Sequence, residues 1–157
     1  MRSQEGSGNV LLVEIPFVAP RPTVPTAPLG LKGLKALVVD DESFLLECLV
    51  DALEAWGLEA VPCARAEEAI QKLETGSYEL IVSDIRMPGL TGVDLYEWLK
   101  VQQPAMCRRI LYTTGDSFDA TTRDFLEATQ VAYLGKPFEL KQLKQSLERL
   151  LEAPAGA

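Results

Sequence analysis

The chain has 157 residues, of which 47% are hydrophobic and 24% are charged, and it carries a formal net charge of −8. This composition suits one folded domain with a core and argues against disorder throughout the chain. The acidic balance also argues against nucleic acid and membrane surfaces as partners, because contacts with phosphate groups need a face rich in Lys and Arg.

The cysteine and histidine content of the chain excludes several kinds of functional site. Cys48, Cys63 and Cys107 lack the paired spacing of a zinc site or a disulfide framework, so we expect reduced thiols. The sequence contains no histidine, so it has no His metal ligand and cannot itself carry a phosphohistidine. Since the first residues show no signal-peptide pattern and no apolar run is long enough to span a bilayer, we expect a cytoplasmic chain without direct membrane contact.

The N-terminal part of the chain differs in composition from the rest. Five prolines fall between residues 15 and 30, and proline at this density prevents helices and sheet ladders, so residues 17–33 are predicted to form an extended linker. Residues 1–33 contain three basic and two acidic side chains, a net charge of +1, which leaves −9 for the remaining residues. The folded domain is therefore expected to begin at residue 34.

Beyond residue 33, short apolar runs alternate with segments in which apolar residues recur at helical spacing. Strands are predicted at residues 36–39, 59–62, 80–82, 110–113 and 131–134. Helices are predicted around residues 45–56, 66–73, 95–99, 117–129 and 140–150. Because the strands are continuous apolar runs, they favour a parallel sheet covered on both faces. The pattern predicts an α/β domain over residues 34–152, doubly wound in three layers, with a five-stranded parallel sheet.

Polar side chains follow the strands at their carboxyl ends, where doubly wound sheets bind ligands. They are Asp40 and Asp41 after the first strand, Asp84 after the third, Thr114 after the fourth and Lys136 after the fifth. Two adjacent carboxylates repel each other, and burial disfavours their ionisation, so a cation or a nearby Lys is needed to relieve them. Carboxylate oxygens suit Mg²⁺, and an Asp can be a nucleophile that forms an aspartyl phosphate. A Lys, a hydroxyl and backbone N–H groups can bind phosphoryl oxygens.

Each of these residues alone has a simpler explanation. Asp41 could cap a helix, Lys136 could be a solvated surface charge, and Thr114 could be a turn residue before Gly115. The conjunction of suitable residues at successive strand ends favours a phosphoryl-transfer site instead.

Four motifs carry a family resemblance: VVDDES at residues 38–43, IVSDIRMPG at 81–89, YTTGD at 112–116 and YLGKPF at 133–138. In order and spacing they resemble the receiver domain of two-component response regulators. The resemblance implies a flavodoxin-like (βα)5 fold in which Asp84 is the phosphoacceptor. It further implies Mg²⁺ or Mn²⁺ held by Asp40, Asp41, Asp84 and the backbone carbonyl of Arg86.

The same resemblance implies roles for residues at the later strands. Thr114, the Gly115 backbone and Lys136 would bind the phosphoryl group. Thr114 and Tyr133 would form the switch that reports phosphorylation to a partner. The Lys136–Pro137 peptide bond is expected to be cis.

The segment SQEGSGNVLLVEIP, residues 3–16, resembles the end of the ATP-binding domain of histidine kinases, although Asn9 replaces the usual Thr or Ser. Residues 1–16 are therefore expected to be a remnant of such a domain, and the chain to be the C-terminal receiver of a hybrid sensor histidine kinase. The chain on its own would be a phosphoacceptor rather than an enzyme. Because only a tail at residues 153–157 follows the last helix, we expect output to pass to another protein. Expected partners are a histidine kinase or a histidine phosphotransfer protein, and a second copy of the chain through the face of its last two helices.

Other interpretations stay open. A stand-alone single-domain response regulator would share the same chemistry. A flavin-binding domain would need a Ser, Thr or Gly-rich loop after the first strand, where this sequence has acids. A phosphatase with an aspartyl nucleophile usually has a second Asp two residues later, where this chain has Arg86, and a phosphorylation-independent interaction module would tolerate the loss of Asp84. Gln130 stands where the family often has glycine, which leaves the turn before the fifth strand open.

Overall fold

The computed structural model describes residues 30–115 and 119–152. The predicted kinase remnant at residues 1–16, nearly all of the proline-rich linker and the tail at 153–157 lie outside the described residues. The compact unit that contains the sheet starts at Leu31, three residues before the predicted boundary. The Leu31 side chain is buried in the core, and the N–H of Gly33 donates to the carbonyl oxygen of Gly57 at 2.7 Å. The last residues assigned to the linker are thus part of the folded domain.

Five strands and five α-helices alternate along the described residues, as the sequence predicts. The strands are β1 (Lys35–Val39), β2 (Glu59–Cys63), β3 (Leu80–Asp84), β4 (Ile110–Thr114) and β5 (Ala132–Gly135). The helices are α1 (Ser43–Ala55), α2 (Ala66–Thr75), α3 (Gly92–Gln102), α4 (Ala120–Thr129) and α5 (Leu140–Glu152). A short 3-10 helix, η2 (Pro104–Arg108), precedes β4. The sequence does not predict η2, because five residues are too few to show a helical repeat.

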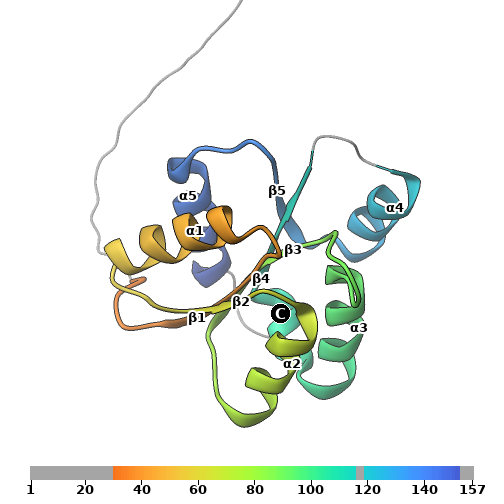
Figure 1. Ribbon diagram of the computed structural model, residues 1–157, viewed down its shortest axis with the longest axis horizontal. Helices are drawn as coiled ribbons and strands as arrows, with labels where there is room; N and C mark the ends of the chain where they lie inside the picture. Colours follow the sequence, from red (N-terminus) through yellow and green to blue (C-terminus); the bar gives the residue numbers. More distant parts are fainter. Residues whose placement is uncertain (1–29, 116–118, 153–157) are drawn as a thin grey trace, which may run out of the picture. The chain divides into compact units, whose positions relative to one another are not determined.

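The strands form one parallel sheet in the order β2-β1-β3-β4-β5, with α1 and α5 on one face and α2 and α3 on the other (Figure 1). The chain passes from β1 outward to β2 and then returns to the other side of β1 for β3. In such sheets, ligands bind at this reversal of strand order, outside the carboxyl ends of the strands. The arrangement confirms the predicted three-layer, doubly wound fold, and it places the ends of β1 and β3 side by side.

Each face of the sheet buries its own apolar cluster. On one face the core includes Leu53 of α1 and Leu147 of α5. On the other face it includes Leu73 of α2, Leu95 of α3 and Leu126 of α4. Every residue of β3 is buried, because helices cover this strand on both faces. This double cover explains why the strand is a continuous apolar run in the sequence.

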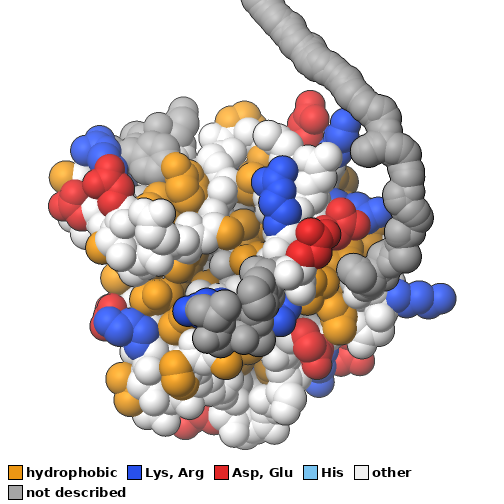
Figure 2. Space-filling view, turned by 180° about the vertical axis from the view of Figure 1, so that it is seen from behind, with side chains coloured by type: hydrophobic (Ala, Val, Ile, Leu, Met, Phe, Trp, Pro, Cys, Tyr) orange, Lys and Arg blue, Asp and Glu red, His pale blue; other side chains and the backbone are white. Residues whose placement is uncertain are grey.

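The described surface carries charges of both signs. On the face shown in Figure 2, basic and acidic side chains lie interspersed among apolar ones, and the described residues form no broad basic area there. The expectation that the chain does not bind nucleic acid stays a prediction. Within the described ranges, every helix is too short or too polar to cross a bilayer.

The turn between α4 and β5 has a residue in an unfavourable backbone conformation. Gln130 ends α4 with φ 57° and ψ 29°, the left-handed region that favours glycine. We expect Gln130→Gly to raise the free energy of unfolding by about 0.5 to 1 kcal/mol, because the relieved strain exceeds the added chain entropy. Gln130→Ala should instead lower it, since the strain stays and the hydrogen bond from Nε2 to the Glu127 carbonyl (2.8 Å) is lost. Urea denaturation compares the variants, and a less stable Gly variant would contradict the prediction.

A buried hydroxyl group in β4 has no hydrogen-bond partner in the part of the chain that the structure describes. Thr113 is fully buried, and its Oγ1 has no partner among the described residues. Because an unpaired buried polar group is costly, Thr113→Val should raise the free energy of unfolding by about 1 kcal/mol. Ser83→Ala is the control, because its equally buried Oγ donates to the Asp84 carbonyl at 2.9 Å, and its removal should be destabilising. A loss of stability in Thr113→Val would show that the hydroxyl has an acceptor.

Candidate functional site

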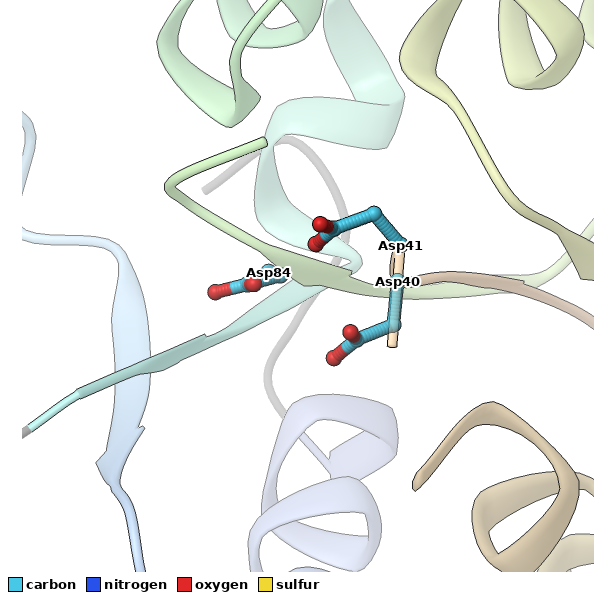
Figure 3. A group of neighbouring side chains, drawn as sticks. All are labelled: Asp40, Asp41 and Asp84. Carbon is cyan, nitrogen blue, oxygen red and sulfur yellow. The ribbon is translucent and has the colours of Figure 1, made fainter. Parts of the chain in front are cut away.

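Three carboxylates meet at the carboxyl ends of β1 and β3 (Figure 3). Asp40 directly follows β1, Asp41 comes next, and Asp84 is the last residue of β3. Each offers one oxygen atom, and these three atoms lie within 4.8 Å of one another. Asp40 and Asp84 are buried, with exposed fractions of 1% and 8%, whereas Asp41 is exposed. The structure therefore brings together all three predicted carboxylates.

The helix-cap explanation for Asp41 does not match the structure. Helix α1 begins at Ser43, and its N-cap residue is Glu42, which makes no capping hydrogen bond with its own side chain. The carboxylate that contacts the start of the helix belongs to Asp40, whose Oδ1 accepts the N–H of Glu42 at 2.9 Å. This hydrogen bond fixes the orientation of the Asp40 carboxylate and leaves its Oδ2 atom for other contacts.

A lysine that follows the last strand adds a positive charge to this group of carboxylates. The Nζ atom of Lys136, directly after β5, lies 3.3 Å from Oδ2 of Asp40 and 3.5 Å from Oδ2 of Asp84. The N–H of Lys136 donates to the Thr114 carbonyl at 2.6 Å, and the Lys136–Pro137 peptide bond is cis. One ammonium group thus bridges two buried carboxylates from neighbouring strands.

The charges in this site do not balance without a further cation. Burial raises the pKa of Asp84 from 3.8 to about 6; the Lys136 charge lowers it, and the Asp40 charge raises it. Three carboxylates within 4.8 Å of one another face a single ammonium group among the described residues. A set of three carboxylate oxygens fits Mg²⁺ or Mn²⁺, which prefer oxygen ligands. These residues therefore fit the divalent cation that the sequence predicts.

The other predicted residues lie along the same half of the sheet. Thr114 ends β4 and is 1% exposed, and its Oγ1 makes only a long contact of 3.5 Å with the Gly115 carbonyl oxygen. A Cβ atom at Gly115 would meet no atom of the described residues within 4 Å. Tyr133 lies on β5 with 46% of its surface exposed. It lines a groove of about 420 Å³ together with residues of α4, Arg123 and Leu126 among them.

The sequence predicts a role only for the backbone carbonyl of Arg86, yet the Arg86 side chain also makes a specific contact. Its Nη1 lies 2.6 Å from Oδ2 of Asp119, whose Oδ1 accepts the N–H of Thr122 at 2.7 Å and so caps α4. The hydrogen bond from Thr122 and the nearby Arg86 charge lower the pKa of Asp119. An Asp at the start of a predicted helix is a capping signal, but nothing in the sequence pairs it with Arg86. This ion pair links the loop after β3 to the start of α4.

Comparisons with known proteins agree with this geometry. The family model of the response regulator receiver domain matches residues 36–148. Sensor kinase CckA of Brucella abortus is 27% identical over 96% of this chain, which corresponds to 17% of CckA. Chemotaxis protein CheY of Pseudomonas aeruginosa is 29% identical over 78% of this chain and 100% of CheY. The chain spans about half or less of the length of several curated relatives that it matches.

Solved structures show the same fold. The response regulator TrrA of Thermotoga maritima, solved in complex with Mg²⁺ and BeF, is 28% identical, with a TM-score of 0.65 over 74% of this chain and 98% of TrrA. The acid pair after β1, the Asp that ends β3 and the Lys after β5 all fall within the residues that the family model matches. The chain therefore belongs to the response regulator receiver domain family of two-component systems.

Proposed function

We propose that this chain accepts a phosphoryl group on Asp84 from the phosphohistidine of a histidine kinase or a histidine phosphotransfer protein. The observation that carries the proposal is the position of Asp84, whose oxygen lies within 4.8 Å of the Asp40 and Asp41 oxygens and 3.5 Å from Lys136. A carboxylate, a cation and a set of metal ligands are the parts that phosphoryl transfer to an Asp requires.

In this reaction, an oxygen of the Asp84 carboxylate attacks the phosphorus atom. The bond between phosphorus and the histidine nitrogen breaks, the imidazole leaves, and Asp84 becomes an acyl phosphate. Lys136 stands next to the attacking carboxylate, where its ammonium group can contact phosphoryl oxygens. The Thr114 hydroxyl and the Gly115 N–H supply further donors at the same edge of the sheet.

Asp40, Asp41, Asp84 and the backbone carbonyl of Arg86 would hold Mg²⁺ or Mn²⁺. When bound, the ion supplies positive charge that offsets the carboxylates and the phosphoryl oxygens. Support comes from the three carboxylates in this chain and from TrrA, a relative solved with Mg²⁺ and BeF.

We further propose that Thr114 and Tyr133 transmit the state of Asp84 to a partner. The exposed Tyr133 ring and the groove between it and α4 offer a surface that responds when Thr114 moves. Dimerisation through the face of α4 and α5 stays a prediction.

The parent protein is proposed to be a hybrid sensor histidine kinase, with this receiver domain in the cytoplasm. The alignment with CckA extends over 96% of this chain, so it takes in residues before the receiver domain, whereas the alignment with CheY covers 78%. A stand-alone regulator is the second candidate, since the match covers all of CheY. A phosphatase is disfavoured, because the residue two positions after Asp84 is Arg86, whose side chain pairs with Asp119.

Intact mass spectrometry after incubation with acetyl phosphate tests the acceptor role, with and without Mg²⁺. We expect the native chain to gain one phosphoryl group only with Mg²⁺, and Asp84→Asn to gain none. Asp51→Asn is the matched control, because Asp51 is an exposed Asp on α1, and it should gain the group like the native chain. A gain of one phosphoryl group by the Asp84→Asn variant would show that another residue is the acceptor. Transfer from a phosphorylated histidine phosphotransfer protein then tests the physiological donor.

A further inference from the structure

The loop that connects β3 to α3, residues 85–91, carries the Arg86 carbonyl and is anchored in the core on its inner side. Ile85 and Met87 are buried in this loop, with exposed fractions of 2% and 6%. The N–H of Gly92, at the start of α3, donates to the Ile85 carbonyl at 2.8 Å. By contrast, Arg86 and residues 88–90 are exposed, so the core does not hold them.

A carboxylate from another helix holds the outer side of this loop. Glu67 lies in the first turn of α2, and its Oε2 accepts the N–H of Leu90 at 2.8 Å. The backbone at Gly89 approaches the same carboxylate, since a Cβ atom there would lie 3.2 Å from Oε2. Helices α2 and α3 lie side by side on one face of the sheet (Figure 1), which brings Glu67 to the loop.

Glu67 makes no described contact with Asp40, Asp41 or Asp84, so apart from the field of its charge, its effect on the site passes through the loop. A backbone carbonyl that serves as a metal ligand has no side-chain rotamer of its own, and only the chain around it fixes its direction. The contact with Leu90, four residues after Arg86, anchors the outer side of the loop together with the ion pair between the Arg86 side chain and Asp119. Groups that hold metal ligands in place tune affinity without touching the ion.

We propose that Glu67 is a positioning residue for the metal site: its hydrogen bond to Leu90 holds the β3–α3 loop so that the Arg86 carbonyl is presented to the divalent cation. The proposal rests on the proposed function, because it takes the Arg86 carbonyl as a metal ligand. It assigns α2, a helix with no residue in the phosphoryl-transfer site, a part in cation binding.

Two substitutions at Glu67 and one matched control test this role. Glu67→Ala removes the acceptor of the Leu90 N–H, whereas Glu67→Gln keeps an acceptor oxygen and removes only the charge. Glu68→Ala is the control, because Glu68 is the next residue on the same helix, carries the same charge, and accepts a different backbone N–H, that of Ala64, at 2.8 Å. Hydrogen exchange at the Leu90 amide, measured without metal, reports the loop directly, and calorimetry with MgCl₂ alone gives the Mg²⁺ affinity.

In Glu67→Ala we expect faster exchange at Leu90 and a Kd for Mg²⁺ about ten-fold higher than in the native chain. Phosphoryl uptake from acetyl phosphate should return towards the native rate at saturating Mg²⁺. Glu67→Gln and Glu68→Ala should keep a Kd close to the native one. A native Kd in Glu67→Ala would overturn the proposal, and a Gln variant as weak as Ala would show that Glu67 acts through its charge. If the native chain itself bound no Mg²⁺, the metal site of the proposed function would fall, and the role of Glu67 with it.

Discussion

We expect the Gly92→Ala chain to lose about 3 kcal/mol of its free energy of unfolding, because this position has no room for a methyl group. A Cβ atom built there would lie 2.6 Å from the Asp84 carbonyl oxygen, 2.8 Å from the Ile85 Cα atom and 2.9 Å from Cε1 of Tyr112. The first two are backbone atoms at the end of β3, which cannot turn away as a flexible side chain can. The carbonyl of Gly92 also accepts a hydrogen bond from the Tyr112 hydroxyl at 2.8 Å, which holds the glycine against the sheet.

Urea denaturation measures this loss. Alanine is otherwise favoured over glycine in a helix, and Gly92 opens α3, so a lower stability can be ascribed to the close contacts. Gly135→Ala is the matched control, because a Cβ atom at Gly135 meets nothing within 4 Å, and this variant should keep the native stability. We also expect slower phosphoryl uptake in Gly92→Ala, since the methyl group displaces the backbone of Asp84. Native stability in Gly92→Ala would contradict the prediction. It would show that the backbone after β3 can shift to accommodate the methyl group at little cost in free energy.

The second large effect is a gain of stability. Without Mg²⁺, we expect Asp84→Asn to be more stable than the native chain by about 3 kcal/mol at about pH 8. Burial raises the pKa of Asp84 in the folded chain from 3.8 to about 6, so between these values the folded chain holds a proton that the unfolded chain has released. The native chain therefore loses stability as the pH rises from about 4 to about 6. A difference of about two pKa units, at about 1.4 kcal/mol each, gives the expected size.

Denaturation curves at about pH 4, 6 and 8 in the presence of a chelator test this prediction. The gain in Asp84→Asn should be full at the highest pH and small at the lowest, where the unfolded chain has released only part of the Asp84 proton. Asp51→Asn controls for the removal of one negative charge at an exposed position and should show no such gain. An Asn variant that is no more stable than the native chain at about pH 8 would mean that the Asp84 carboxylate is well stabilised without a metal ion.

The sequence predicts the order of the elements and the main residues of the site for a physical reason. In a parallel sheet covered on both faces, strands are continuous apolar runs, and the residue after each strand lies at the ligand-binding edge. Asp40, Asp84 and Lys136 could therefore be placed together from their position after predicted strands alone. The structure shows the Asp40 and Asp84 carboxylates within 3.5 Å of the Lys136 ammonium group.

The sequence does not predict contacts that depend on how separate elements pack. Glu67 looks like an ordinary acidic residue in the first turn of a helix, and only the packing of α2 beside the β3–α3 loop shows its contact with Leu90. The Arg86 ion pair joins two loops for the same reason. The prolines before Leu31 predict that it belongs to the linker, yet its side chain is buried. Gln130 occupies a backbone region in which propensity alone would place glycine.

The bridge between Lys136 and Asp40 joins residues 96 positions apart in the chain. During synthesis, the three acids leave the ribosome well before the lysine does, and β5 must then pair with β4 before the ammonium group can reach them. An unfinished chain, or one clipped before β5, holds Asp84, the proposed acceptor, but lacks Lys136. If Asp84 is the acceptor, we expect such fragments to be poor competitors for phosphoryl groups.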